Sequence, residues 1–311
     1  MRLTESAARE AAESRFLNPF RVLSEDERAR DLAAYRQFLT GRDGEPDVES
    51  RVLSRRESRM RAIEQNPVVW AGALDRDAFA RFVAGDRSGP FDGRTELALA
   101  AALANESENY GVDIELRRFA KQGKLPGLRE PDLLLSVYVQ EAYHCRILIE
   151  LCRTCGIEFR PRRPAFAIRA LVGIIGVLPG ALRWVPVMAG EIVATAVFRL
   201  LYRRLDLFAS NPAAHARMCE LLRAIWIDEI GHVAFLRAQL GPVALAVAWA
   251  LLPLVAIAVL RDLPPLVELG ITPRRILESL RNGIEIPSEI TWVPQESVAE
   301  PDESERELSR A

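Results

Sequence analysis

Residues 131–155 read PDLLLSVYVQEAYHCRILIELCRTC, an apolar-periodic stretch with a Glu-x-x-His motif near its centre, Glu141 to His144. Proline is a favoured first helical residue, so the stretch predicts a helix that begins at Pro131. Residues three apart on a helix lie about 60° from each other, so Glu141 and His144 project from one face. Leu148 follows on that face, which makes it the buried one. A carboxylate there must be paired, protonated or bound to a metal.

The motif occurs a second time, as Glu229-Ile-Gly-His232, in a predicted helix over 212–240. The chain has three histidines, and two of them lie in these motifs. The third, His215, is about 21 Å from Glu229 along the same helix, too far to share a metal. Either motif alone is more readily explained as a Glu–His pair at the rim of the core. The repetition indicates instead that both helices contribute to one metal site.

A predicted helix over 95–121 supplies another inward carboxylate. Its large apolar residues, among them Leu103 and Tyr110, define a face that includes Glu106. Glu108 points about 160° away from Glu106 and is expected in solvent. The sequence therefore predicts Glu106, and not Glu108, as a metal ligand.

The fourth carboxylate comes from a predicted helix over 185–205. Glu191 is the only acidic residue between Phe166 and Arg204, and its neighbours are apolar. An unpaired buried carboxylate costs several kcal/mol, so Glu191 is expected to have a partner.

Four long helices without strand-forming alternation predict an all-α fold, a four-helix bundle with additional N- and C-terminal helices. A capping box at Ser24–Glu27 starts a peripheral helix that runs to Thr40. The expected organisation along the chain has four parts: N-terminal helices and loops over 1–93, the bundle over 94–240, an apolar helical extension over 241–288, and an acidic, disordered tail over 289–311.

The four long predicted helices form two similar halves, 95–155 and 185–240, and each half is a helix with one Glu followed by a helix with Glu-x-x-His. This arrangement resembles the ferritin-like di-iron carboxylate superfamily. That superfamily includes ribonucleotide reductase small subunits, bacterial multicomponent monooxygenases, rubrerythrins and, more distantly similar to this chain, the p-aminobenzoate N-oxygenase family. The resemblance covers about Thr95 to Leu240. It implies two iron ions, or manganese, with Glu141 and Glu229 as bridging carboxylates. The other ligands it implies are Glu106 and His144 on one iron, and Glu191 and His232 on the other.

The resemblance also extends to residues behind the ligands, with departures. Asp228 matches an acid that commonly holds the histidine of the second helix. Gln140 occupies the mirror position, where an acid is common in relatives, and its amide oxygen can accept from His232. Leu148 stands where ribonucleotide reductases carry a radical tyrosine, which argues against that role. Ile225 stands where the N-oxygenase family has an additional histidine, which puts membership of that family in doubt.

The residues expected around the ligands are apolar, and they favour oxidation of a small apolar or aromatic molecule over iron storage. Such an enzyme needs O2 and an electron donor, which the sequence does not identify. Two alternatives stay open: a ferroxidase without an organic substrate, and a membrane-associated structural protein with a vestigial site. The expected pocket residues are Val137, Leu148, Phe198, Ile225 and Trp226.

The bulk composition bears on location and partners. A net charge of −2 gives no field that attracts nucleic acid, and the arginines over 51–61 are interpreted as solvated surface. The polar start, Met1 to Arg15, is not a secretory signal, which predicts a cytoplasmic protein. Residues 241–260 are uncharged and long enough to span a bilayer, but a helix buried in the fold is favoured over membrane-surface contact and over a span. A homodimer is compatible with the sequence.

Overall fold

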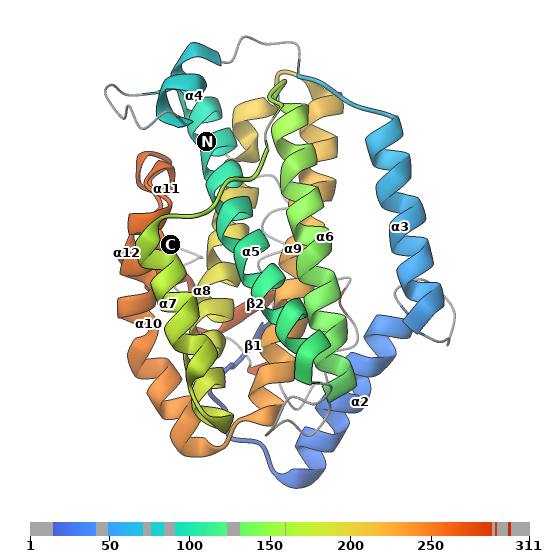
Figure 1. The fold of residues 1–311 in the computed structure, drawn as a ribbon, viewed down its shortest axis with the longest axis vertical. Coiled ribbons are helices and arrows are strands. Elements are labelled where there is room, and N and C mark those ends of the chain that lie inside the picture. Colours follow the sequence, from blue (N-terminus) through green and yellow to red (C-terminus); the bar gives the residue numbers. More distant parts are fainter. Residues whose placement is uncertain are drawn as a thin grey trace, which may run out of the picture.

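The computed structural model describes residues 15–41, 49–70, 76–83, 91–122, 131–158, 160–287, 290 and 298–299. These residues are predominantly helical, so the all-α prediction is confirmed (Figure 1). Among the described residues, strands are few and short, and long helices dominate.

Four long helices form the centre of the molecule. They are α5 (Gly93–Gln122), α6 (Pro131–Thr154), α8 (Trp184–Arg203) and α9 (Pro212–Gln239). Along the group, α5 packs on α6, α6 on α9, and α9 on α8. Their bounds differ from the predicted ones by only one or two residues.

Local sequence explains where these helices begin. Pro131 and Pro212 occupy first-turn positions, where a missing backbone N–H costs nothing. The side chain of Asn211 caps α9 by accepting from the backbone N–H of Ala214 at 3.1 Å. Strong start signals thus fix the register of α9, on which one Glu-x-x-His motif depends.

Helices from the N-terminal part cover this group. They are α2 (Glu25–Gly41), α3 (Glu49–Gln65) and α4 (Arg76–Val83), which pack on α9, α6 and α5 respectively. The capping box of α2 is present: the backbone N–H of Ser24 donates to Glu27 at 2.8 Å, and that of Glu27 donates to the Ser24 hydroxyl at 3.3 Å.

The remaining helices lie between and after the central ones. Between them are α7 (Phe166–Val177) and the 3₁₀ turns η1 (Gly180–Arg183) and η2 (Arg204–Phe208). After them come α10 (Pro242–Asp262), α11 (Pro265–Glu268) and α12 (Pro273–Ser279). Helix α10 packs on α8 and α12, and α11 packs on α5.

A small sheet was not predicted. Strand β1 (Arg15–Leu17) pairs antiparallel with β2 (Ile284–Ile286) on one side and with β3 (Val298–Ala299) on the other. Strands of two or three residues are too short to show an alternating pattern, so they could not be predicted from the sequence. Within the predicted tail over 289–311 the structure describes only Ile290 and strand β3, and the other residues of the tail lie outside the described residues.

Helix α10 is less buried than expected. Two helical segments, Trp184–Phe208 and Pro242–Asp262, are long and apolar enough to cross a membrane, although core helices of soluble proteins pass the same test. The first is mostly buried inside the molecule, whereas only 28% of the most apolar window of α10 is buried. The expectation of a fully buried α10 is therefore corrected: one stripe packs on its neighbours and the rest is exposed.

A glycine in the second motif lets α2 approach α9 closely. A Cβ atom at Gly231 would lie 2.6 Å from Cε2 of Tyr35 in α2. The Tyr35 ring is fully buried beside Phe38 and Phe235, with ring centroids 6.1 and 6.0 Å away, so it has little room to move.

We therefore expect Gly231→Ala to lower the free energy of unfolding by about 1–3 kcal/mol, the usual cost of overpacking a core. Gly111→Ala in α5 is the matched control, because no atom lies within 4 Å of the Cβ position there. The control should gain roughly 0.5–1 kcal/mol from the higher helix propensity of alanine. Urea unfolding of both variants measures this, and equal stabilities would contradict the close approach of α2.

Candidate metal centre

Helices α6 and α9 bring the two Glu-x-x-His motifs face to face. The side chains of His144 and His232 are both fully buried, and their ring centroids lie 5.6 Å apart. In each ring, Nδ1 faces carboxylates from the two motifs while Nε2 faces a residue outside them. The structure therefore brings the two motifs together in one cluster, and metal binding by that cluster stays a prediction.

The two motif glutamates each contact both histidines. Glu141 places Oε1 2.8 Å from Nδ1 of His232 and Oε2 3.3 Å from Nδ1 of His144. Glu229 places Oε1 3.4 Å from Nδ1 of His144 and Oε2 3.8 Å from Nδ1 of His232. Each carboxylate therefore offers one oxygen to each histidine, which is the arrangement that a carboxylate bridging two ions requires.

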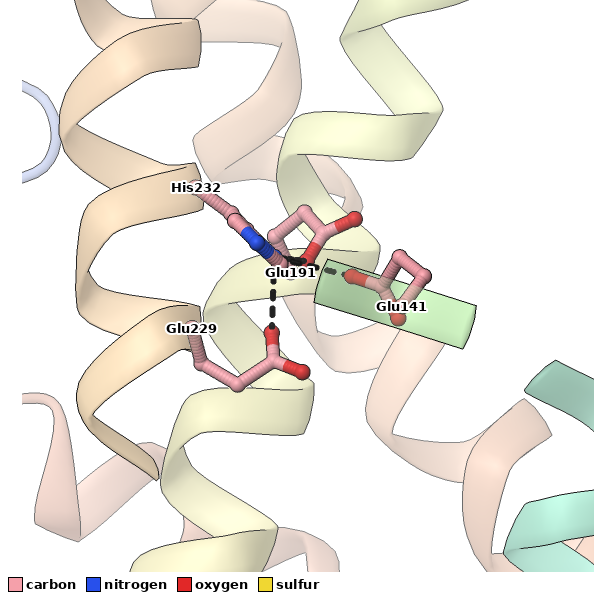
Figure 2. Close-up of side chains that lie close together, drawn as sticks. All are labelled: Glu141, Glu191, Glu229 and His232. Atoms are coloured by element: carbon pink, nitrogen blue, oxygen red, sulfur yellow. Dashed lines mark ion pairs between the residues drawn. The ribbon is translucent and has the colours of Figure 1, made fainter. Parts of the chain in front are cut away.

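Glu191 of α8 joins the cluster from the side of His232. Its Oε2 lies 3.5 Å from Nδ1 of His232, and Figure 2 shows it with Glu141 and Glu229 around that ring. The ligand atoms of Glu141, Glu191, Glu229 and His232 all lie within 4.8 Å of one another. These four residues form one group that can hold a metal ion.

The second group corrects the prediction for α5. It consists of Glu108, Glu141 and His144, again with ligand atoms within 4.8 Å of one another. Glu106, the expected ligand, lies instead beside Arg162 and Asp262, and burial raises the pKa of its carboxyl. In α5, Glu108 belongs to the cluster and Glu106 does not.

The cause of the wrong register is the size of the residues on the inner face of α5. That face carries Ala101, Ala104 and Asn105 before Glu108, and all three are buried. Small side chains let α5 approach α6 closely, and the side chain of Asn105 donates to the backbone carbonyl of Cys145 there. The large residues used for the prediction point elsewhere: Leu103 is only partly buried. An argument from apolar size fails where helices pack through alanine.

Polar residues hold each histidine from behind. His144 Nε2 lies 3.3 Å from Oδ2 of Asp228, and His232 Nε2 lies 3.0 Å from Oε1 of Gln140, so both contacts expected from the sequence are present. The Gln140 amide also donates to Asp228 at 2.9 Å, which links the two halves. Such partners fix the ring orientation, here with Nδ1 toward the carboxylates.

Two further residues of this network were not predicted. Arg56 of α3 donates to both oxygens of Asp228, at 3.0 and 3.2 Å, and thereby neutralises the aspartate. The Tyr35 hydroxyl of α2 donates to Oε1 of Gln140 at 2.9 Å. Arg56 was interpreted as solvated surface, and nothing local in the sequence distinguishes it from the arginines around it. Both contacts join residues far apart in the chain, which single-sequence patterns do not report.

Burial and mutual repulsion raise the pKa of two of the carboxyls. Burial, with the nearby charge of Glu229, raises the pKa of Glu191 to about 8. Burial, with the charge of Glu141, holds the pKa of Glu108 well above its ordinary value. Both groups therefore bind a proton near neutral pH when no cation is present.

The other members of the cluster form ion pairs. Burial alone would lower the pKa of each histidine, but the surrounding carboxylates, Glu141 foremost, together outweigh it and hold the pKa of His144 and of His232 well above the ordinary value. Burial would raise the pKa of Glu141 and Glu229, but the two histidines hold both below the ordinary value. Two imidazolium ions and two carboxylates thus balance, and the metal-free cluster is close to neutral.

The buried polar atoms of the cluster fit metal ions better than they fit one another. Oε2 of Glu108, Oε1 of Glu141, Oε2 of Glu229 and Nδ1 of both histidines are inaccessible to solvent and make no hydrogen bond of acceptable geometry. The 2.8 Å approach of Glu141 to His232 is therefore a contact of charges without hydrogen-bond alignment. Buried polar atoms without a hydrogen-bond partner need an explanation, and a bound ion is one that these ligand types allow.

The five apolar residues expected to line a substrate pocket are all buried. They do not line the open pocket between α3, α6 and α9, whose walls include Arg59, Met60 and Ile147 and which reaches Asp228. That pocket approaches the cluster from behind His144. The expected residues are buried in the hydrophobic core: Val137, Leu148, Phe198, Ile225 and Trp226.

Comparison with known proteins adds no assignment: no family model, curated protein or solved structure matches this chain.

The position of Glu108 generates a prediction about metal binding. We expect Glu108→Gln to weaken binding of Mn²⁺ or Fe²⁺ at least about tenfold, because it removes an anionic ligand from one of the two groups. Glu106→Gln is the matched control, on the same helix and outside the cluster, and should bind as the wild type does. Equilibrium dialysis under anaerobic conditions measures both. Loss of metal from the Glu106 variant alone would show that Glu106 is the ligand, as predicted from the sequence, and that Glu108 is not.

The charge state generates a second prediction. Metal binding must displace one proton from each of two histidines and two carboxylic acids, four in all, so two divalent ions replace four protons. Because these pKa values are raised, with that of Glu191 at about 8, metal affinity should increase with pH between 6 and 8. Calorimetric titration with Mn²⁺ in buffers of different ionisation enthalpy counts the released protons. Affinity that does not change between pH 6 and 8 would contradict this charge state.

Proposed function

We propose that this chain is a ferritin-like protein that binds two iron or manganese ions and uses them to activate O2 for oxidation of a small apolar or aromatic molecule. The observation that carries the proposal is the bridging arrangement of Glu141 and Glu229 between two histidines. One further carboxylate stands on each side, Glu108 next to His144 and Glu191 next to His232.

The number of ions follows from charge. Four ionised carboxylates around two neutral imidazoles carry four negative charges, which two divalent cations balance and one does not. Asp228 adds nothing to this count because Arg56 neutralises it. A ligand set of carboxylates with two histidines suits iron or manganese, and it lacks the thiolates that favour zinc or copper. When bound, two such ions supply the electrons that reduce O2.

The surroundings of the cluster support an organic substrate. The ligand side chains of His144, His232 and Glu229 are buried, and the helices around them contribute apolar side chains such as Leu148 and Ile225, which are fully buried. An enclosed apolar site keeps water away from a reactive oxygen species and favours apolar molecules. The role of this chain's residues is to hold the ions, orient the rings through Asp228 and Gln140, and exclude water. The electron donor is a separate partner.

Single-turnover experiments test this function. Purified protein is loaded anaerobically with Fe²⁺, its metal content is measured, and O2 is added in a stopped-flow instrument with and without small aromatic compounds. We expect two ions per chain, an optical change at a rate that a suitable compound alters, and incorporation of ¹⁸O into, or dehydrogenation of, that compound.

Two results would contradict the proposal at different levels. Fewer than one ion per chain would remove the di-metal site itself. Two ions with continuous oxidation of many Fe²⁺ ions per chain, unaffected by every organic compound, would instead assign a ferroxidase and leave the metal site intact. The Glu108→Gln variant serves as the control in both measurements, because it should lose the optical change.

A further inference from the structure

Helix α10 exposes an apolar face along its length. Its buried residues Leu245, Ala248, Leu252 and Ala256 form one stripe, which lies against α8 and α12. The opposite face, within about 40° of one direction, is exposed and apolar until Arg261 in the last turn, which points the same way. Its large apolar residues are Val243, Val247, Leu254 and Ile257, with exposed fractions of 76, 46, 63 and 41%. Water-exposed faces of soluble proteins seldom have this composition over a whole helix.

Helix α7 exposes a second apolar face. Apart from Arg169 its residues are uncharged, and Phe166, Leu171, Ile174 and Val177 are all exposed. The guanidinium of Arg169 lies over the ring of Phe166, 5.8 Å from its centroid. The helix therefore presents aliphatic side chains together with an aromatic ring and a cation at its start.

The end of α10 and the segment before α7 come together at one place on α5, called the junction below, where several arginines lie. Ser107 of α5 donates to Asp262 at the end of α10 at 2.6 Å, and Arg162, which precedes α7, affects the carboxyl of the adjacent Glu106. The end of α10 and the segment that leads into α7 therefore converge on one point of α5, and in Figure 1 both helices lie on the same side of the molecule. Four exposed arginines lie close to this point in the chain, Arg160, Arg162, Arg163 and Arg261, against the carboxyls of Glu106 and Asp262 and the exposed Glu158.

From this juxtaposition we infer that the exposed faces of α7 and α10, with the arginines between their ends, bind the surface of an anionic lipid bilayer. Apolar side chains enter the boundary between headgroups and acyl chains, and arginines contact lipid phosphates, as in other interfacial helices. Trp249, exposed at 63% on the flank of α10, suits this boundary because its ring is amphipathic. This inference does not depend on the metal site.

The contacts of α10 favour a helix that lies on the membrane over one that spans it. Its buried stripe packs on α8, which carries Glu191 into the carboxylate cluster, and on α12, where Arg274 and Glu278 form an exposed ion pair. A spanning α10 would carry these charges into hydrocarbon. A second copy of the chain is a poorer occupant, because a symmetric contact centred on the junction would bring the arginines of both copies together.

Vesicle binding by the full chain tests the inference. The protein is sedimented with phosphatidylcholine vesicles that contain or lack phosphatidylglycerol, and Trp249 emission is followed with brominated acyl chains as quencher. We expect binding to the anionic vesicles, weakened by salt, together with quenching that the Trp249→Phe variant loses. Trp70, Trp184 and Trp226 are buried, so they should contribute little to this response.

Variants separate the two parts of the surface. Replacing both Val243 and Val247 by Glu should lower partition into anionic vesicles at least about tenfold, since the protein loses two apolar side chains that would enter the bilayer. Val69→Glu, at a valine that is 53% exposed and outside α7 and α10, is the matched control and should bind normally. Replacing both Arg160 and Arg163 by Gln should lower binding about tenfold or more in low salt. Thermal unfolding and metal content check that each variant is folded.

Three outcomes would overturn the inference. The first is no sedimentation of the wild-type protein with anionic vesicles. The second is equal binding to both vesicle types, which would remove the role of the arginines. The third is a dimer in lipid-free solution, detected by analytical ultracentrifugation, that the Val243 and Val247 double variant abolishes; this would assign the face to a second copy of the chain.

Discussion

The structure depends on one electrostatic constraint, the burial of four carboxylates within a core of apolar helices. An isolated ionised carboxylate in a medium of low dielectric constant costs far more than the roughly 5–15 kcal/mol by which a typical domain is stable. The chain meets the constraint in two ways. Without metal, Glu108 and Glu191 take up protons and Glu141 and Glu229 pair with two imidazolium ions. With metal, two divalent cations can replace these protons at the same net charge.

The central helices supply the charged groups of the cluster, and the outer helices hold the residues that contact them. The four central helices provide the carboxylates and histidines, and the polar pair Asp228 and Gln140 fixes both rings. Each of these two polar residues has a partner from an outer helix: Arg56 from α3 neutralises Asp228, and Tyr35 from α2 donates to Gln140. The N-terminal helices are therefore part of the site, although they contribute no ligand to it. Gly231 matters for the same reason, since only a residue without a side chain leaves room for Tyr35.

The features that could be predicted from the sequence are those that depend on residues close together in the chain. Apolar periodicity and proline at helix starts predicted the bounds of the central helices, and the repeated Glu-x-x-His motif identified the cluster because helical spacing alone puts its members on one face. Single-sequence reasoning failed for Glu108, because the close contact between α5 and α6 is made by alanines that a search for large apolar residues overlooks. It also missed Arg56, Tyr35 and the three short strands. All of these depend on contacts between segments far apart in the chain, and α10 was misjudged because composition does not say how much of an apolar helix is covered.

Anomalous X-ray diffraction from crystals grown with Mn²⁺ tests the central claim most directly. The bridging arrangement of Glu141 and Glu229 predicts two anomalous peaks about 3.5–4 Å apart, the usual separation in two-metal sites. One peak should lie between Glu108 and His144 and the other between Glu191 and His232. A single peak, two peaks without a shared carboxylate, or a peak beside Glu106 would contradict the account.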